Sequence, residues 1–318
     1  MLSIMHGEQK LVNMKSSFPQ NKIICTIISE TRYSIGRDGA ILGLDPTVEE
    51  IDHLSSLFKQ VFHFAPLYKT PPPPSFKKHK KPNVKVIPMV PVEGYDFSRK
   101  LKHVFLFIHH LLKLRPYLKK TDIIHLRAPI GFGVLFLPWL FLFWGKKIWI
   151  KYGGSWSSKD VPLSYKFQRW LLLYFPKNAI ITINNSTKTL EKNFLQFFNP
   201  CFSKNIIEAN KIIVNEKNFN NGLNLVFVGR VEANKGIDHL FEIFQKIEQM
   251  KNINSLKIIG GSKRESYYKE IALKISSKIA MLGLLNRKDI FKIYSESHIL
   301  ILLSKSEGFP KVIMEAGV

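Results

Sequence analysis

The amino-acid sequence predicts an α/β fold made of two tandem domains, each built on a parallel sheet. The length of 318 residues fits about two domains of ordinary size. Short apolar, β-branched runs alternate with helical patterns, an order typical of parallel sheets covered by helices. A polar stretch at residues 205–222 separates two such series and is the predicted linker. Hydrophobic residues make up 45% of the chain, which excludes the composition of a disordered protein.

The first predicted domain covers residues 21–204 and follows a disordered N-terminus at residues 1–20. Four apolar runs are predicted to be strands: residues 22–29, 122–126, 146–152 and 179–183. The first 20 residues lack a continuous apolar core, so we predict no signal peptide.

Two long helices are predicted in this domain. Thr47 is the expected N-cap of the first, with Glu50 as its capping-box partner and apolar residues at helical spacing as far as Val61. The proline run at residues 71–74 and the lysine-rich segment after it are predicted to be loop. The second helix is predicted at residues 97–119.

The second predicted domain covers residues 223–318. Its expected strands are residues 223–229, 256–261, 279–283 and 298–303. An amphipathic helix follows the first strand, and Ser262 with Glu265 forms the predicted capping box of the next helix. Asn286 is the expected cap of a third helix, which runs to about Glu296.

The formal net charge of +23 favours an anionic partner, such as phosphorylated substrates, an anionic membrane surface or nucleic acid. No recognisable nucleic-acid module accompanies the charge, so nucleic acid is the least favoured of the three. Cys25 and Cys201 are the only cysteines and form neither metal-ligand spacing nor a disulfide framework, which points to a reducing cytoplasm. We expect no bound metal.

Two segments raise the question of membrane contact. Residues 128–144 carry no charge but are short and interrupted by glycine and proline, so a buried helix is favoured over a membrane-dipping segment. Residues 97–120 carry seven basic residues and no acidic one. This helix either docks peripherally on an anionic membrane surface or presents an ordinary solvated face.

Two cations flank the first loop of the second domain. Gly229 and Arg230 close the first strand, and Lys235 precedes the helix that follows. A helix N-terminus already favours anions, and arginine and lysine both bind phosphate oxygens. The spacing therefore suits a diphosphate, although two solvated surface cations would give the same pattern.

Two carboxylates, Glu307 and Glu315, lie eight residues apart near the end of the chain. Pro310 is better placed at the first position of a helix than inside one, so Glu307 is predicted in the loop before that helix and Glu315 in its second turn. Backbone N–H groups of Gly308 and Phe309 would be free to donate. One carboxylate then faces a sugar and the other accepts from a ribose diol.

These segments resemble the group 1 (family 4) glycosyltransferases, which are retaining enzymes of GT-B fold with two Rossmann-like domains facing a cleft. The resemblance implies that Arg230 and Lys235 bind the nucleotide diphosphate, replacing a metal ion as stabilisers of the leaving group. By the same resemblance, Glu307 binds the transferred sugar, Glu315 binds the ribose, and Arg230, Lys235 and Glu307 are the catalytic residues.

The first half resembles the acceptor domain of the subgroup that builds bacterial surface polysaccharides. The matching segments contain Arg37, then His125 and Arg127, and then residues 152–156. The resemblance implies that Arg127 meets an acceptor phosphate and that His125 orients an acceptor hydroxyl. Ser155 stands where relatives commonly carry Asp, so no role is assigned to it.

The resemblance implies a lipid-linked acceptor on the cytoplasmic membrane face. Family members continue beyond the helix of Glu315, whereas this sequence ends at Val318. We therefore expect a truncated second domain, and an inactive remnant or scaffold is the alternative to an active enzyme. The sequence names neither the donor sugar nor the acceptor.

Overall fold

The computed structural model describes residues 22–91, 97–158, 161–176, 178–184, 193–197, 208, 217–305, 307 and 310–317, with the backbone alone at 97–104. The chain divides into two compact units, one made mainly of residues up to Phe197 and one mainly of the residues after it. The predicted domain boundaries at residues 204 and 222, and the cleft between the domains, stay predictions.

The first unit contains a ten-stranded sheet in the order β10-β9-β8-β7-β1-β4-β2-β3-β5, with β6 also paired to β4. The pairings are parallel except for the β2–β3 hairpin, as far as the described registers show. The strands are β1 (Ile24–Ile28), β2 (Tyr33–Ile35), β3 (Ile41–Leu44), β4 (Gln60–Tyr68), β5 (Phe76–Lys77), β6 (Val84–Met89), β7 (Ile123–Ala128), β8 (Lys147–Tyr152), β9 (Ala179–Ile183) and β10 (Phe194–Gln196).

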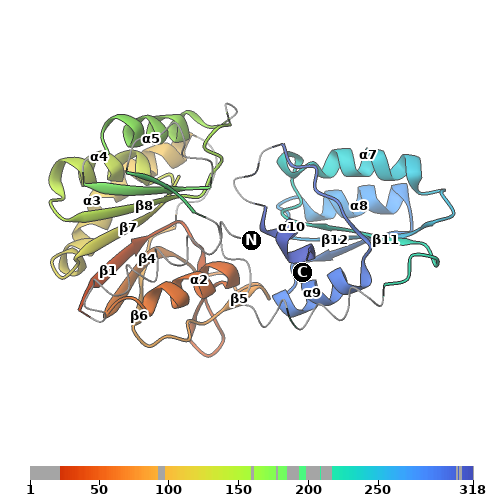
Figure 1. Ribbon diagram of the computed structural model, residues 1–318, viewed down its shortest axis with the longest axis horizontal. Coiled ribbons are helices and arrows are strands. Elements are labelled where there is room, and N and C mark those ends of the chain that lie inside the picture. The colour runs from red at the N-terminus through yellow and green to blue at the C-terminus, as the bar shows by residue number, and fades with distance from the viewer. Residues whose placement is uncertain are drawn as a thin grey trace. The chain divides into compact units, whose positions relative to one another are not determined.

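Helices cover both faces of this sheet (Figure 1). On one face lie α3 (Phe97–Leu118), α4 (Gly133–Phe143) and α5 (Leu163–Tyr174). Their inner side chains join one core cluster with alternate strand residues, so Leu114, Leu137 and Leu172 pack over Ile124 and Ile150. On the other face lies α2 (Asp45–Ser55), whose inner residues pack on the side chains that the same strands direct the opposite way.

The predicted boundaries of α2 are wrong. The helix begins at Asp45 with Leu44 as its N-cap, so Thr47 lies inside the first turns and forms no cap. Pro46 explains the shift, because proline fits the first positions of a helix, where no N–H partner is needed. The helix also ends at Ser55, residues 56–59 form a turn, and Gln60–Tyr68 form β4, so Val61 is a strand residue.

Strand β6 was missed because it lies in the segment predicted to be loop. Its sequence contains Pro88, which removes one backbone donor. Among the described registers β6 pairs only with β4. Pro88 therefore interrupts no hydrogen bonds to a second neighbouring strand. Every predicted strand is present with small shifts at its ends, except that the strand predicted at residues 298–303 is shortened to Ile299–Leu300.

The two segments considered for membrane contact are both helical. The prediction of a helix at residues 97–119 is confirmed by α3. The helix predicted within residues 128–144 is α4, which buries Phe136, Leu137 and Leu140 but leaves Leu142 and Phe143 exposed. Within the part of the chain that the structure describes, no helix combines the length and apolar character that a membrane span requires.

The second unit contains a four-stranded parallel sheet in the order β13-β12-β11-β14. Its elements are β11 (Leu223–Val228), the 3₁₀ turn η1 (Ala233–Lys235), α7 (Ile237–Ile247), β12 (Ile253–Ile259), α8 (Glu265–Ile275), β13 (Ile279–Gly283), α9 (Arg287–Glu296), β14 (Ile299–Leu300) and α10 (Lys311–Ala316). One face of the sheet packs on α7 and α8, and the other packs on α9 and α10. The α/β class with two parallel sheets is thus confirmed.

The two predicted caps of this unit differ in outcome. Asn286 caps α9 as expected, accepting from the backbone N–H of Asp289 at 3.0 Å. The capping box at Ser262 is wrong, because α8 begins only at Glu265 and the Ser262 hydroxyl accepts from the N–H of Arg264 at 3.0 Å. Ser262 therefore closes a short turn before the helix rather than the helix itself.

Candidate functional site

The carboxyl edge of the second sheet brings together loops that are far apart in the sequence. The N–H of Gly229, after β11, donates to Ile259 O at 3.0 Å, and the N–H of Val231 donates to Gly261 O at 3.0 Å. On the other side, the N–H of Lys305 donates to Asn234 O at 3.1 Å. The loops after β11, β12 and β14 therefore form one continuous edge, the place where open parallel sheets bind ligands.

Two glycines permit this close approach. Gly260 has a φ of 143°, and a Cβ there would lie 1.7 Å from Gly229 O. Gly236 has a φ of 77°, and a Cβ would lie 2.3 Å from Leu303 O. Both positions need a backbone conformation that side chains disfavour, in a space that a side chain would fill.

Lys235 and Glu307 meet across this edge. The Lys235 Nζ donates to Glu307 Oε1 at 2.5 Å, joining the end of η1 to the loop before α10. Both side chains are partly buried, with exposed fractions of 17% and 24%. The loop position predicted for Glu307 is confirmed. The structure thus brings together one predicted phosphate ligand and the predicted sugar ligand.

Arg230 lies on the same loop but in a more open position. Its Nη1 lies 3.1 Å from Glu232 Oε2, and its side chain is 62% exposed. The guanidinium is therefore accessible at the sheet edge, with a neighbouring carboxylate as its partner. The sequence interpretation missed Glu232, although its place two residues after Arg230 was a visible signal.

Glu315 lies in the second turn of α10, as predicted, and faces α9. Its Oε1 lies 3.7 Å from Arg287 Nη2, and both side chains are largely buried. Pro310 is the N-cap of α10, one position before the predicted first turn. Arg287 was missed in the sequence because only its neighbour Asn286 had been considered, for capping. Gly308 and Phe309 lie outside the described residues.

A separate charged cluster lies in the first unit at the end of β7 and β8. Glu50 of α2 accepts from Arg127 Nη2 at 3.0 Å and also pairs with Lys151, which lies beside Arg127 on the neighbouring strand. Burial raises the pKa of Glu50, but Arg127 and Lys151 outweigh it and hold that pKa at about 2. Glu50, predicted as a capping residue, is instead the counter-ion of two buried cations.

His125 lies two residues before Arg127 on β7, and its ring lies against that of Trp149, with 3.8 Å between ring centroids and a tilt of 32°. Burial and the charge of Arg127 lower its pKa to about 3, so the ring is neutral at physiological pH. Arg37 is exposed in the turn between β2 and β3, and no described contact joins it to the other two predicted acceptor residues. His125 and Arg127 are thus brought together, and Arg37 is not.

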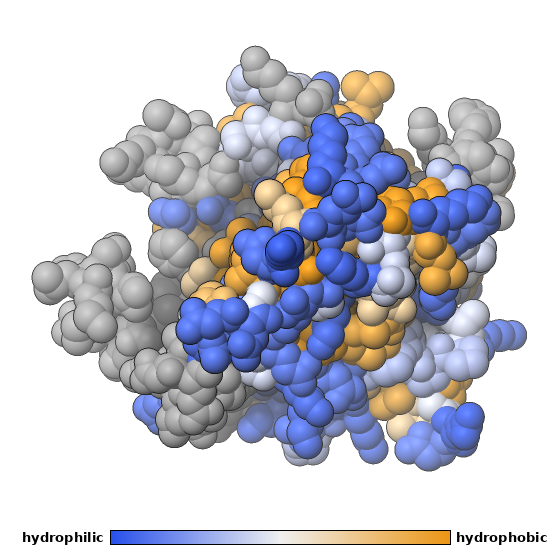
Figure 2. Space-filling view, turned by 90° about the vertical axis from the view of Figure 1, so that its right-hand side faces the viewer, coloured by the Kyte–Doolittle hydropathy of each residue, from blue (hydrophilic) through white to orange (hydrophobic). Residues whose placement is uncertain are grey.

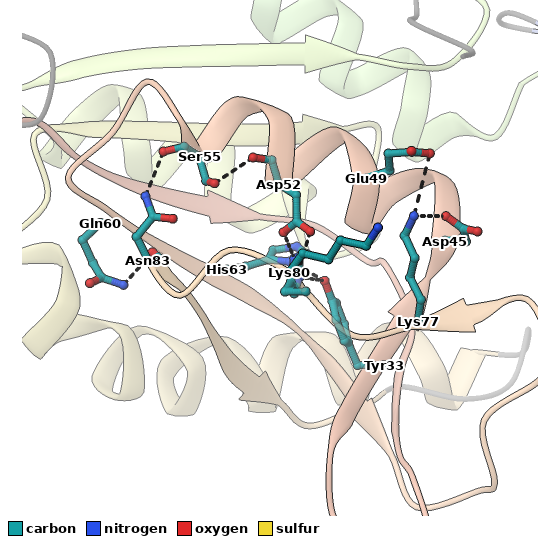
Figure 3. A network of polar contacts seen from close by, with 11 residues as sticks. Tyr33, Asp45, Glu49, Asp52, Ser55, Gln60, His63, Lys77, Lys80 and Asn83 are labelled. Carbon is teal, nitrogen blue, oxygen red and sulfur yellow. Dashed lines mark hydrogen bonds and ion pairs between the residues drawn. The ribbon is translucent and has the colours of Figure 1, made fainter. Parts of the chain in front are cut away.

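A hydrogen-bonded network joins Asp52 of α2, Tyr33 and His63 (Figure 3). His79 Nδ1 lies 2.6 Å from Asp52 Oδ1, and Tyr33 Oη lies 2.8 Å from His79 Nε2 and 2.9 Å from His63 Nδ1. His63 Nε2 in turn lies 2.8 Å from Ser29 Oγ. Burial lowers the pKa of His63, so a neutral ring linking two hydroxyls fits this chain. The network fixes α2 against the end of β1.

Among the residues that the structure describes, no three His, Cys, Asp or Glu side chains lie together as metal ligands would. The edge of the second sheet instead offers arginine and lysine, which bind phosphate oxygens directly. The arrangement suits a diphosphate held by cations and a sugar hydroxyl held by a carboxylate.

The sequence model of the family described as "Glycosyl transferases group 1" matches residues 209–318, which contain the whole of this edge. Residues 209–318 therefore match the group 1 glycosyltransferases. The glycosyltransferase segment therefore includes every residue predicted to bind the donor.

Curated relatives are similar over shorter stretches. An uncharacterized glycosyltransferase of Haemophilus influenzae is 27% identical over 145 residues, which are 44% of this chain and 39% of the relative. An uncharacterized glycosyltransferase of Methanocaldococcus jannaschii is 30% identical over 94 residues, or 29% of this chain and 24% of the relative. The matched stretches thus span well under half of either relative.

Solved structures match over nearly the whole chain. Sucrose-phosphate synthase from Thermosynechococcus elongatus has a TM-score of 0.65 at 14% identity, covering 93% of this chain and 79% of that one. WaaG, a glycosyltransferase involved in lipopolysaccharide biosynthesis, has a TM-score of 0.54 at 14% identity, covering 92% and 78%. These likenesses establish the fold, so the predicted GT-B fold class is confirmed.

Proposed function

We propose that the protein transfers a sugar from a nucleotide diphosphate sugar to a glycan acceptor, with retention of the anomeric configuration. The contact between Lys235 and Glu307 carries this proposal, because it places a phosphate-binding cation and a sugar-binding carboxylate within hydrogen-bond distance. The family match of the same residues supports it.

In the proposed mechanism, Arg230 and Lys235 hold the diphosphate and stabilise the charge that develops on it as the glycosidic bond breaks. Glu307 positions the sugar, and Glu315 accepts from the ribose, in exchange for part of its contact with Arg287. The acceptor hydroxyl attacks from the face that the diphosphate leaves, and a phosphate oxygen takes its proton. Retention then needs no carboxylate nucleophile, unlike most retaining glycoside hydrolases.

We assign acceptor binding to the first unit, with Arg127 and His125 near the acceptor and Arg37 at the outer turn. Surface polysaccharide synthesis on a lipid-linked acceptor, at the inner membrane face, is the setting we propose. The fold shared with a glycosyltransferase involved in lipopolysaccharide biosynthesis supports that setting. Nucleic acid is not a proposed partner.

Donor binding tests the proposal. We expect UDP or GDP to raise the thermal midpoint of the protein, and Lys235→Met to weaken that binding. Loss of a charge-assisted hydrogen bond costs about 1.5–3 kcal/mol, or roughly 10- to 150-fold in affinity. Lys274→Gln is the matched control, because Lys274 is an exposed lysine in the last turn of α8, at the far end of that helix from the edge, and pairs with Glu270.

Turnover separates the enzyme from its alternative, an inactive remnant. Incubation with radiolabelled sugar nucleotides should release labelled sugar or glycan, and Glu307→Gln should abolish that release while leaving nucleoside diphosphate binding largely intact. Donor binding without any release would favour the remnant. Equal binding by Lys235→Met and the wild type would overturn the assigned donor site.

A further inference from the structure

The three helices on one face of the first sheet carry a second apolar surface that faces outward. Core packing accounts for their inner residues, which join the large cluster of the first unit. It does not account for the outer face of α5, where Leu163, Phe167, Trp170 and Tyr174 recur at helical spacing. Their exposed fractions run from 38% to 81%.

Helix α3 repeats the pattern. Phe105, Ile108 and Leu112 also recur at helical spacing, with exposed fractions of 72%, 65% and 62%. Helix α4 contacts both α3 and α5, and its last residues, Leu142 and Phe143, are exposed as well. The three helices therefore present one band of apolar side chains on the outside of the same layer. We call these nine residues, with Phe175, the outer apolar face.

The aromatic residues of α5 form a cluster of their own. Phe167 stacks on Trp170 with 6.0 Å between ring centroids, and Trp170 lies 6.0 Å from Tyr174 and 5.3 Å from Phe175. Aromatic side chains with a polar atom, such as those of Trp170 and Tyr174, are enriched where a bilayer meets water. Such a cluster is therefore chemically suited to the headgroup level of a membrane.

The segment that carries these helices is strongly basic, although Arg127 and Lys151, at the ends of β7 and β8, pair with Glu50. Residues 97–176 contain fourteen basic and two acidic residues, the acids being Asp122 and Asp160. Asp122 is engaged by the N–H of Ile24 at 2.9 Å. Exposed cations accompany the outer apolar face: Lys113 and Arg115 lie on α3, Lys166 lies on α5, and Lys119 and Lys120 lie in the turn directly after α3. Apolar and basic groups on one surface match an anionic lipid bilayer.

The surface drawn in Figure 2 provides a contrast. There, hydrophilic residues cover most of the face and interrupt the apolar ones. The helices of the second unit also mix charges: on α8, the exposed Leu273 is followed by Lys274, which pairs with Glu270. Exposed apolar residues alone are ordinary, but an aromatic band among cations with almost no acid is not.

We propose that the outer apolar face lies on an anionic lipid bilayer, with the α5 aromatic cluster inserted at the headgroup level. This surface rests on the proposed function in one respect, since it would hold the first unit beside a lipid-linked acceptor. In this arrangement all three helices contact the bilayer. The cations of α3 attract the protein to anionic lipid, and the aromatic residues of α5 anchor it there.

Vesicle binding by the full chain tests the proposal. We expect co-sedimentation with vesicles made of equal parts phosphatidylglycerol and phosphatidylcholine, and little with phosphatidylcholine alone. The double variant Phe167→Ser, Trp170→Ser should bind vesicles at least about tenfold more weakly, because it removes two exposed aromatic anchors of the outer apolar face. Leu273→Ser, an exposed apolar residue of α8, is the matched control and should bind like the wild type.

A conservative variant keeps the test valid if the serine variant fails to fold. Vesicles with brominated lipid should quench part of the tryptophan emission of the wild type, and Trp170→Phe should lose much of that quenching while it still binds. Equal quenching in both proteins would overturn the insertion of α5. Equal binding by the folded double variant and the Leu273 control would do the same.

Two further measurements distinguish lipid binding from self-association, and failure of the lipid surface from failure of the proposed function. If the wild type ignores vesicles but forms a dimer that Phe167→Ser, Trp170→Ser abolishes, the outer apolar face binds a second copy of the chain, and the lipid proposal is wrong. Binding of UDP is measured on the same samples. Loss of vesicle binding with intact UDP binding contradicts only the lipid surface, whereas loss of UDP binding by the wild type contradicts the proposed function.

Discussion

At the scale of single residues, the donor edge holds its cations beside carboxylates. Lys235 contacts Glu307, and Arg230 contacts Glu232. A diphosphate that binds Arg230 must therefore compete with a carboxylate two residues away. Because the guanidinium is mostly exposed, that competing pair is worth only about 0.2–1 kcal/mol.

Removal of this competitor should strengthen donor binding. We expect Glu232→Gln to raise the affinity for UDP or GDP by up to about fivefold, since the substitution keeps the shape and removes the charge. Isothermal titration at low salt measures the change, and high salt should shrink it. Glu242→Gln on α7 serves as control. Weaker binding by Glu232→Gln would show that Glu232 itself contacts the ligand.

At the scale of elements, the donor edge depends on how closely its loops approach. The backbones at Gly229 and Gly260 are so near that a single added carbon would overlap a carbonyl oxygen. The loop conformation is therefore set by the absence of a side chain as well as by hydrogen bonds. Sequence patterns identified the strands and helices here, but they gave no sign that Gly260 serves the loop after β11.

Gly260→Ala should destabilise the second unit and weaken donor binding together. Backbone strain alone costs about 1–3 kcal/mol, and the overlap with Gly229 O adds to it. Chemical denaturation followed by circular dichroism measures the loss. Gly145→Ala is the control, because a Cβ at Gly145 meets nothing within 4 Å. Equal stability of the two variants would contradict the close approach.

At the scale of the whole molecule, each unit has its own hydrophobic core. The largest cluster draws only on the first unit, and two other clusters draw only on the second. Two separate cores allow two separate unfolding transitions. The sequence offers a natural probe, because all five tryptophans lie between residues 139 and 170, in the first unit.

Nucleoside diphosphate should therefore stabilise one unit selectively. UDP or GDP at a hundredfold excess over its dissociation constant adds about 2.7 kcal/mol to the state that binds it. Far-ultraviolet circular dichroism reports the unfolding of both units, and we expect the part of its transition that belongs to the second unit to move to higher temperature. The transition followed by tryptophan fluorescence, which reports the first unit, should stay unchanged. An equal shift of both signals would mean that the units unfold as one or that the first unit contributes to binding.

The sequence by itself determined the α/β class, most strands, and the family of residues 209–318, because these depend on local periodicity and on short motifs. The place of Glu307 in a loop also followed from one proline. Only the tertiary structure decided which side chains meet: Lys235 with Glu307, Arg287 with Glu315, and Glu50 with Arg127 and Lys151. Such pairs join residues 28 to 101 positions apart, so their contact depends on how strands order in the sheet.

The same reason explains the errors. Glu50 was predicted as a cap because its neighbours in sequence allowed one, whereas two cations on adjacent strands determine its contacts. The outer apolar face was invisible in the sequence for a similar reason. A helical pattern shows that residues share a face, but only packing against the sheet shows which face remains outside.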